Sequence, residues 1–231
     1  MPEHQGTTFD DHDPLAHHIL QVLEDFIDEI GHRGCTGHFD SVLTSNKELD
    51  GRHLVQRPER FIEDHLVYPV LTDALDYSIR PQPKQYAPPW PRKSGVPDFC
   101  VTSVPVDVAM DNDLRVFGEV KRPKHIEGAR KDMKEYLRME EDLHAVAVLT
   151  DGFDCELWVR PRGRQISELD NPVAKTSLKD PLKVVRTRNM SLEPYRPYQV
   201  RNRIDSDGFE EFTVDSLISR IHDLGLDNIQ V

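Results

Sequence analysis

Two carboxylates and one ammonium lie on neighbouring apolar segments in the middle of the chain. Asp98 precedes a short apolar run at residues 99–101, and Glu119 and Lys121 end a second run at residues 114–121. Both runs are rich in Val and Phe and are bounded by Gly, Pro, Asn and Asp, which is typical of β-strands. Two hard oxygen ligands beside an ammonium suit a Mg²⁺-type cation and a water molecule activated against a phosphate.

Strand geometry predicts how these side chains point. Successive side chains of a strand project to opposite faces, so Glu119 and Lys121 share one face while Val120 points the other way, into a core. Asp98, at the start of the neighbouring strand, would complete a cluster of two carboxylates and an ammonium. An exposed ion pair on an edge strand, with Asp98 capping a turn, is the structural alternative.

The order Pro97-Asp98, then Glu119-Val120-Lys121, resembles the PD-(D/E)XK nuclease signature. Residues 57–160 resemble the N-terminal nuclease domain of type I restriction enzyme R subunits. The resemblance implies an α/β fold with a restriction-endonuclease-like core, in which a central mixed β-sheet is flanked by helices. It also implies metal-dependent hydrolysis of DNA phosphodiester bonds, in restriction, defence or DNA processing.

The resemblance assigns roles to the cluster. Asp98, Glu119 and the backbone carbonyl of Val120 would bind Mg²⁺ or Mn²⁺. Lys121 would orient or help to deprotonate the attacking water and stabilise charge on the phosphate. Its pKa would fall toward neutrality if it were partly buried near the metal.

A further ligand is expected from a helix over residues 58–76, whose apolar residues recur at helical spacing. Pro69 lies within the pattern and is expected to kink the helix. In the resembled family, a glutamate early in this helix helps to hold the metal. Glu59 best matches that glutamate, as a catalytic and metal-binding residue, and Glu63, one turn later, is the alternative. A solvated helix face would explain both glutamates equally well.

The next predicted helix covers residues 125–142. Tyr136 matches a tyrosine of the resembled family, but Asp132 stands where the family has a glutamine. This departure concerns an accessory catalytic residue rather than the metal ligands. It favours the alternative function, a catalytically inactive PD-(D/E)XK-fold module that binds DNA or a protein.

Charge is distributed unevenly along a chain whose formal net charge is −12. Residues 1–79 carry 5 Lys and Arg against 16 Asp and Glu, residues 80–138 carry 12 against 8, and residues 160–203 carry 11 against 4. Local positive charge is what contact with phosphates requires. The candidate DNA-binding residues are Arg92, Lys93, Arg122, Lys124, Lys131 and Lys134.

The overall bias has its own interpretation. Aspartate is abundant and the chain contains 19 Arg and 10 Lys, a usage that looks like that of a halophilic protein with an acidic, soluble surface. In such a cytoplasm, the net charge says little about partners.

The flanking regions predict an N-terminal extension at residues 1–56, the nuclease-like core at 57–160, and a basic irregular segment with a C-terminal helix at 161–231. The extension contains an amphipathic helix from Pro14, capped by Asp13 and stopped at Gly31. Short strands are expected around residues 182–187, and Thr213 caps the last helix.

Other sites have weaker support. His32, Cys35 and His38 recur at three-residue intervals, but structural zinc sites usually show two tight ligand pairs, so a polar loop is the favoured interpretation. The three cysteines lack paired spacing and are expected to be reduced, in a cytoplasmic protein without a membrane span or signal peptide. There is no Gly-x4-Gly-Lys-Ser/Thr loop, so the chain carries no ATP motor of its own, and it either acts alone or works with a helicase or methyltransferase subunit in trans.

Overall fold

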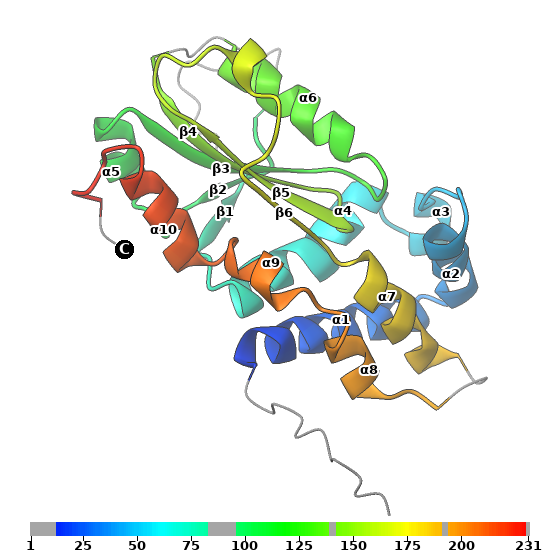
Figure 1. The fold of residues 1–231 in the computed structure, drawn as a ribbon. Coiled ribbons are helices and arrows are strands. Elements are labelled where there is room, and N and C mark those ends of the chain that lie inside the picture. Colours follow the sequence, from blue (N-terminus) through cyan, green and yellow to red (C-terminus); the bar gives the residue numbers. More distant parts are fainter. Residues whose placement is uncertain (1–12, 83–95, 139–141, 191–193, 230–231) are drawn as a thin grey trace, which may run out of the picture.

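The computed structural model describes residues 13–82, 96–138, 142–190 and 194–229 and is built around a mixed six-stranded sheet (Figure 1). Its strands lie side by side in chain order, and β3 and β4 are parallel while the other neighbours are antiparallel. The strands are β1 (Ile79–Pro81), β2 (Phe99–Val101), β3 (Leu114–Val120), β4 (His144–Thr150), β5 (Asp154–Arg160) and β6 (Ala174–Ser177). The expected α/β class with a central mixed sheet is therefore confirmed.

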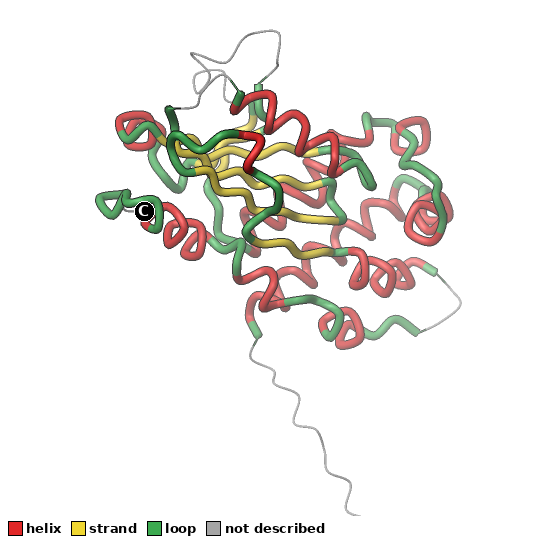
Figure 2. Tube along the Cα trace, turned by 45° about the horizontal axis from the view of Figure 1, so that its top comes forward, coloured by secondary structure: helices red, strands yellow, loops and turns green. Residues whose placement is uncertain are grey.

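Helices cover both faces of this sheet (Figure 2). One face packs on α6 (Ile126–Leu137), the crossover between the parallel strands β3 and β4, through Phe117, Ala147 and Met133. The opposite face belongs to a larger cluster that includes Val116 and Val148. Alternate residues of β3 thus enter different cores, as the period-two pattern predicts.

The N-terminal helices contribute about half of the buried residues of the larger cluster. α1 (Pro14–His32) buries its apolar stripe and begins as expected, because Asp13 Oδ1 accepts a hydrogen bond from the Ala16 N–H at 2.9 Å. It continues past Gly31 to His32, and the chain reverses at Gly34, whose φ is +67°.

The predicted helix over residues 58–76 is present but is not a regular α-helix. α4 (Pro58–Ile62) continues into two π-helical segments, η1 (Glu63–Val67) and η2 (Val70–Ala74). Pro69, which has no N–H to donate, lies between them. The missing hydrogen bond at Pro69 thus coincides with wider turns on either side of it, and the chain stays helical through residues 58–74.

Several short elements were not predicted. The polar loop expected around His38 is wrong, because residues there form α2 (Thr36–Thr44). Two further short helices, α3 (Gly51–Leu54) and α5 (Val106–Asp111), lie before α4 and between β2 and β3. The first strand, β1, covers only Ile79–Pro81, and residues 83–95 lie outside the described ones. Similarly, α6 ends at Leu137, and residues 139–141 are not among those described.

The C-terminal region is more regular than expected. The short strands predicted around residues 182–187 are wrong, because Leu182 and Val185 face the core from α7 (Lys179–Val185), which runs into the 3₁₀ turn η4 (Arg186–Asn189). The region also supplies η3 (Ile166–Glu168), the edge strand β6, α8 (Pro197–Arg201), α9 (Ser206–Glu210) and α10 (Val214–His222). α10 begins at Thr213 as predicted, since the Thr213 hydroxyl accepts from the Ser216 N–H.

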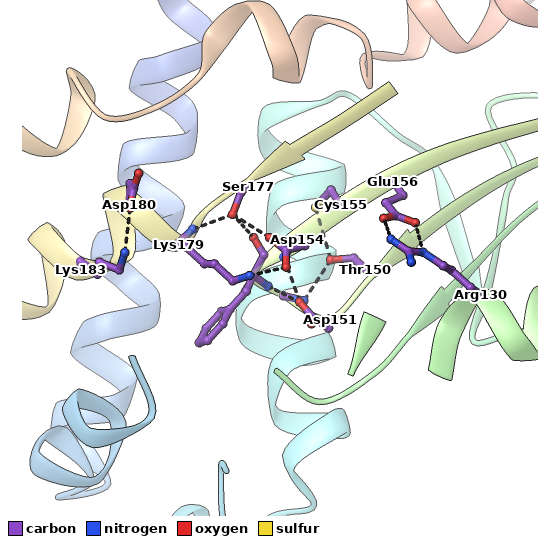
Figure 3. A network of polar contacts seen from close by, with 12 residues as sticks. Arg130, Thr150, Asp151, Asp154, Cys155, Glu156, Ser177, Lys179, Asp180 and Lys183 are labelled. Atoms are coloured by element: carbon purple, nitrogen blue, oxygen red, sulfur yellow. Dashed lines mark hydrogen bonds and ion pairs between the residues drawn. The ribbon is translucent and has the colours of Figure 1, made fainter. Parts of the chain in front are cut away.

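A polar network closes the end of β5 (Figure 3). Asp154 accepts hydrogen bonds from Ser177 Oγ at 2.9 Å and from Lys179 Nζ at 2.5 Å. Further along β5, the buried Glu156 binds the guanidinium of Arg130 with both carboxylate oxygens. These contacts join β5 to α7 on one side and to α6 on the other.

Candidate functional site

Asp98 and the end of β3 meet where β2 begins. Asp98 Oδ2 accepts a hydrogen bond from the Val120 N–H at 2.7 Å. The next N–H, of Lys121, donates instead to the carbonyl of Thr150 on β4 at 2.9 Å. Because a residue's N–H and C=O point to the same side of its strand, the Val120 carbonyl faces the side on which Asp98 lies. The carbonyl and the carboxylate that the family resemblance assigns to one metal therefore face the same side of β3.

Glu119 and Lys121 share one face of β3, as predicted. Lys121 Nζ lies 2.5 Å from Glu119 Oε1, and the Tyr136 hydroxyl donates to Glu119 Oε2 at 3.1 Å. The Glu119 side chain is only 3% exposed. Val120 points into the opposite core and is also buried.

Asp132 takes part in the cluster. Its Oδ2 lies 2.8 Å from Lys121 Nζ, so the ammonium is shared between Asp132 on α6 and Glu119 on β3. Asp132 and Tyr136 are four residues apart and therefore lie on the same side of α6. The sequence located both positions, but the ion pair between Asp132 and Lys121 was not anticipated.

The two glutamates of the first half of the 58–76 helix, Glu59 and Glu63, differ in burial. Glu63 is buried and its Oε2 lies 3.0 Å from Arg60 Nη1, whereas Glu59 is exposed. The charge of Asp98 raises the pKa of Glu63, and that of Glu59 raises the pKa of Asp98, so both glutamates act on Asp98. Glu63 is thus the buried glutamate of the two, and Glu59 the exposed one.

The carboxylates of the cluster bind protons unusually tightly. Burial, with the charge of Asp98, raises the pKa of Glu119 to about 8 and that of Glu63 to about 7. Burial likewise raises the pKa of Asp98, although the Val120 N–H and Lys121 oppose the shift. Carboxyl groups that repel one another in a region poor in water favour a bound proton or cation.

The pKa of the Lys121 ammonium is raised, whereas the predicted fall toward neutrality concerned a lysine beside a bound metal. Burial alone would lower the pKa of its ammonium, but the charges and hydrogen bonds of Glu119 and Asp132 outweigh burial and raise it. In this arrangement, Lys121 is a fixed positive charge and hydrogen-bond donor rather than a near-neutral base.

A divalent metal ion fits the donor chemistry of the cluster. Asp98, Glu119 and the Val120 carbonyl offer hard oxygen atoms, and burial raises the pKa of both carboxyl groups, so a bound cation would stabilise their charged forms. No preformed group of three or more His, Cys, Asp or Glu side chains arranged to hold a metal ion occurs in the part of the chain that the structure describes. A metal would therefore draw on the carbonyl as well as on side chains.

The predicted DNA-binding residues differ in whether their charged groups already have partners within the protein. Lys124 Nζ donates to the backbone carbonyls of Ser45 and Lys47, and Arg122 pairs with Glu48. On α6, Lys134 lies over the Trp158 ring at 5.8 Å, and the side chain of Lys131 is exposed. Arg92 and Lys93 lie outside the described residues.

The second basic segment is largely paired within the molecule. Arg188 Nε lies 3.0 Å from Asp28 Oδ1 on α1, and Arg186 forms an ion pair with Asp40 on α2. These arginines therefore join the C-terminal region to the acidic N-terminal helices. The charge separation seen along the sequence is partly cancelled in three dimensions.

The residues of the zinc alternative make other contacts. Cys35 Sγ donates to the His53 carbonyl at 2.6 Å, and His38 Nε2 accepts from the Asp50 N–H at 3.0 Å. The rings of His38 and His53 stack with centroids 4.3 Å apart. Burial raises the pKa of the Cys35 thiol, which disfavours the thiolate that zinc requires.

Comparisons of the chain with protein-family models, curated proteins and solved structures found no match. None of the helices in the described ranges combines the length and the apolar character that crossing a membrane requires. Function must therefore be inferred from the site itself.

Proposed function

We propose that this protein is a metal-dependent DNA nuclease of the PD-(D/E)XK type, with a restriction-endonuclease-like core. The observation that carries the proposal is the convergence of Asp98, Glu119 and Lys121, from separate strands, with the Val120 carbonyl on the Asp98 side. Residues 21 positions apart in sequence, Asp98 and Glu119, are close enough for the charge of one to raise the pKa of the other.

The residues would divide the work as follows. Asp98, Glu119 and the Val120 carbonyl would hold Mg²⁺ or Mn²⁺, with Glu63 acting on the cluster from the helix side. The bound metal supplies a Lewis acid that polarises the phosphate and lowers the pKa of a water molecule. Lys121, charged, would donate a hydrogen bond to the attacking water or to a phosphate oxygen and stabilise the charge that develops there.

The test is cleavage of circular and linear DNA with Mg²⁺ or Mn²⁺ over several salt concentrations. Asp98→Ala and Lys121→Ala should each lose at least a hundredfold in rate, while the exposed positions Asp107→Ala and Lys175→Ala serve as matched controls. Circular dichroism at each salt concentration shows whether the protein is folded. No cleavage by folded wild-type protein with either metal would contradict the proposal.

A second candidate function is a catalytically inactive module of the same fold that binds DNA or a protein. The observation that favours it is the Asp132–Lys121 ion pair, because a carboxylate near the scissile phosphate repels it and occupies the ammonium. Binding of DNA without cleavage, unchanged in Lys121→Ala, would support this function over the nuclease.

A further inference from the structure

The loop after α2 is attached to the loop that follows Lys121. Lys124 Nζ donates to the carbonyls of Ser45, at 2.5 Å, and Lys47, at 3.0 Å. Lys124 has a φ of +72°, a left-handed conformation that is uncommon for a residue with a side chain. The N-terminal extension therefore reaches the segment next to the proposed catalytic lysine.

Glu48, in the same loop, is held by two basic side chains at once. Arg122 Nη1 lies 3.0 Å from Glu48 Oε2, and His125 Nε2 lies 3.1 Å from Glu48 Oε1. Two donors that each hydrogen-bond one oxygen of a carboxylate can hydrogen-bond two oxygens of a phosphate in the same way. Arg122 and His125 thus form a site that can bind two oxygen atoms of an anion. In the structure, these are the two carboxylate oxygens of Glu48.

The ion pair between Glu48 and Arg122 is held in place by the core, but it is exposed enough for another anion to replace Glu48. Leu49 is only 2% exposed, so the core fixes the loop on one side of Glu48. The Glu48 side chain itself is 52% exposed and that of Arg122 is 41% exposed. Ion pairs with this exposure are weak, because water and salt screen them, so a polyanion can replace them.

The ion pair between Glu48 and Arg122 lies next to the candidate site. Arg122 directly follows Lys121 in the chain, and His125 immediately precedes α6, which carries Asp132. If a scissile phosphate lies at Lys121, a neighbouring phosphate of the same strand is the natural partner of Arg122. The carboxylate of Glu48 occupies Arg122 instead.

We propose that Glu48 is an intramolecular competitor of DNA. Its carboxylate takes the place of a backbone phosphate on Arg122 and His125, and DNA must displace it in order to bind. The inference rests on the proposed function, because it takes DNA as the ligand and Lys121 as the centre of the site. It gives the N-terminal extension a regulatory role.

The experiment is binding of a short fluorescein-labelled DNA duplex, followed by fluorescence anisotropy in EDTA so that no cleavage occurs. Glu48→Gln keeps the shape of the side chain and should tighten binding about three- to tenfold. Glu127→Gln removes the same charge from a nearby exposed position and should change binding less than twofold, because its partner Arg130 remains bound to Glu156. The double variant Glu48→Gln/Arg122→Gln should lose the gain.

Other results would overturn the inference. Binding by Glu48→Gln that is no tighter than binding by Glu127→Gln, or no DNA binding by any variant, would contradict it. A lower melting temperature of Glu48→Gln without tighter binding would show that the pair is only a structural clamp. Tighter binding by Glu48→Gln together with no cleavage in Mg²⁺ or Mn²⁺ would support the competitor and contradict the nuclease, so the two proposals can fail separately.

Discussion

Asp132 Oδ2 lies 2.8 Å from Lys121 Nζ, so the candidate catalytic ammonium is held by a carboxylate from the helix that crosses between β3 and β4. The pair restrains Lys121 and also places a negative charge where a phosphate would approach. If the protein cuts DNA, Asp132 therefore limits the rate at which it does so.

Replacing Asp132 should speed up cleavage. Asp132→Gln removes the negative charge and frees one contact of the Lys121 ammonium, while Glu119 continues to hold it. We expect the rate of DNA cleavage in Mn²⁺ to rise about three- to tenfold. Glu135→Gln, an exposed position on the same helix, is the control, and a slower Asp132→Gln variant would show that Asp132 takes part in the reaction.

The two helix glutamates should differ in importance. Glu63 is buried and close enough to Asp98 to be shifted by its charge, whereas Glu59 is exposed. Glu63→Gln should lower cleavage at least tenfold, and Glu59→Gln less than threefold, when rates are measured at several Mg²⁺ concentrations. The reverse order would restore Glu59 as the metal-binding residue.

Metal binding should compete with protons. The pKa of Glu119 is raised to about 8, so its carboxyl is protonated below that pH and must lose the proton to bind a metal. The affinity for Mn²⁺, measured by calorimetry, should fall about tenfold for each pH unit below 8. Glu119→Gln should bind Mn²⁺ weakly at every pH, and tight binding by this variant would rule out Glu119 as a ligand. An affinity of the wild-type protein that is constant from pH 6 to 8 would contradict the raised pKa.

The same raised pKa predicts how stability depends on pH without metal. A carboxyl whose pKa is higher in the folded than in the unfolded state stabilises the fold fully below its unfolded pKa, near 4.5, and loses that contribution as pH rises through its folded pKa, about 8 for Glu119. The melting temperature in EDTA should therefore fall between pH 5 and 8.5. Glu119→Gln should flatten this dependence, and an equal slope in both proteins would contradict it.

Gly118 should be essential for the pairing that places Asp98 beside β3. Gly118 lies opposite Phe99, and a Cβ at this position would be 1.9 Å from Phe99 Cζ. Gly118→Ala should cost about 3 kcal/mol, seen as a melting temperature lower by about 6–12 °C. Gly37→Ala, where a Cβ meets nothing within 4 Å, should be neutral or slightly stabilising. Equal melting temperatures of the two variants would contradict the close packing at Gly118.

Local patterns were sufficient for the principal elements. The helical period of α1 and the apolar, Val- and Phe-rich run of β3 are set by which residues can be buried together, and both were predicted from residue types and their spacing. Glu119 and Lys121 on one face with Val120 on the other follow from strand geometry. The short helix α2 and the helix α7 were missed, because their burial comes from distant segments rather than from strong local periodicity.

The sequence by itself therefore determined the α/β class and the residue types of the cluster. Only the tertiary structure decided that Glu63 rather than Glu59 is buried near Asp98, that Asp132 holds Lys121, and that Glu48 occupies Arg122. These are contacts between elements far apart in the chain. Whether two charges meet depends on how helices pack on the sheet, and no spacing within a single element records that packing.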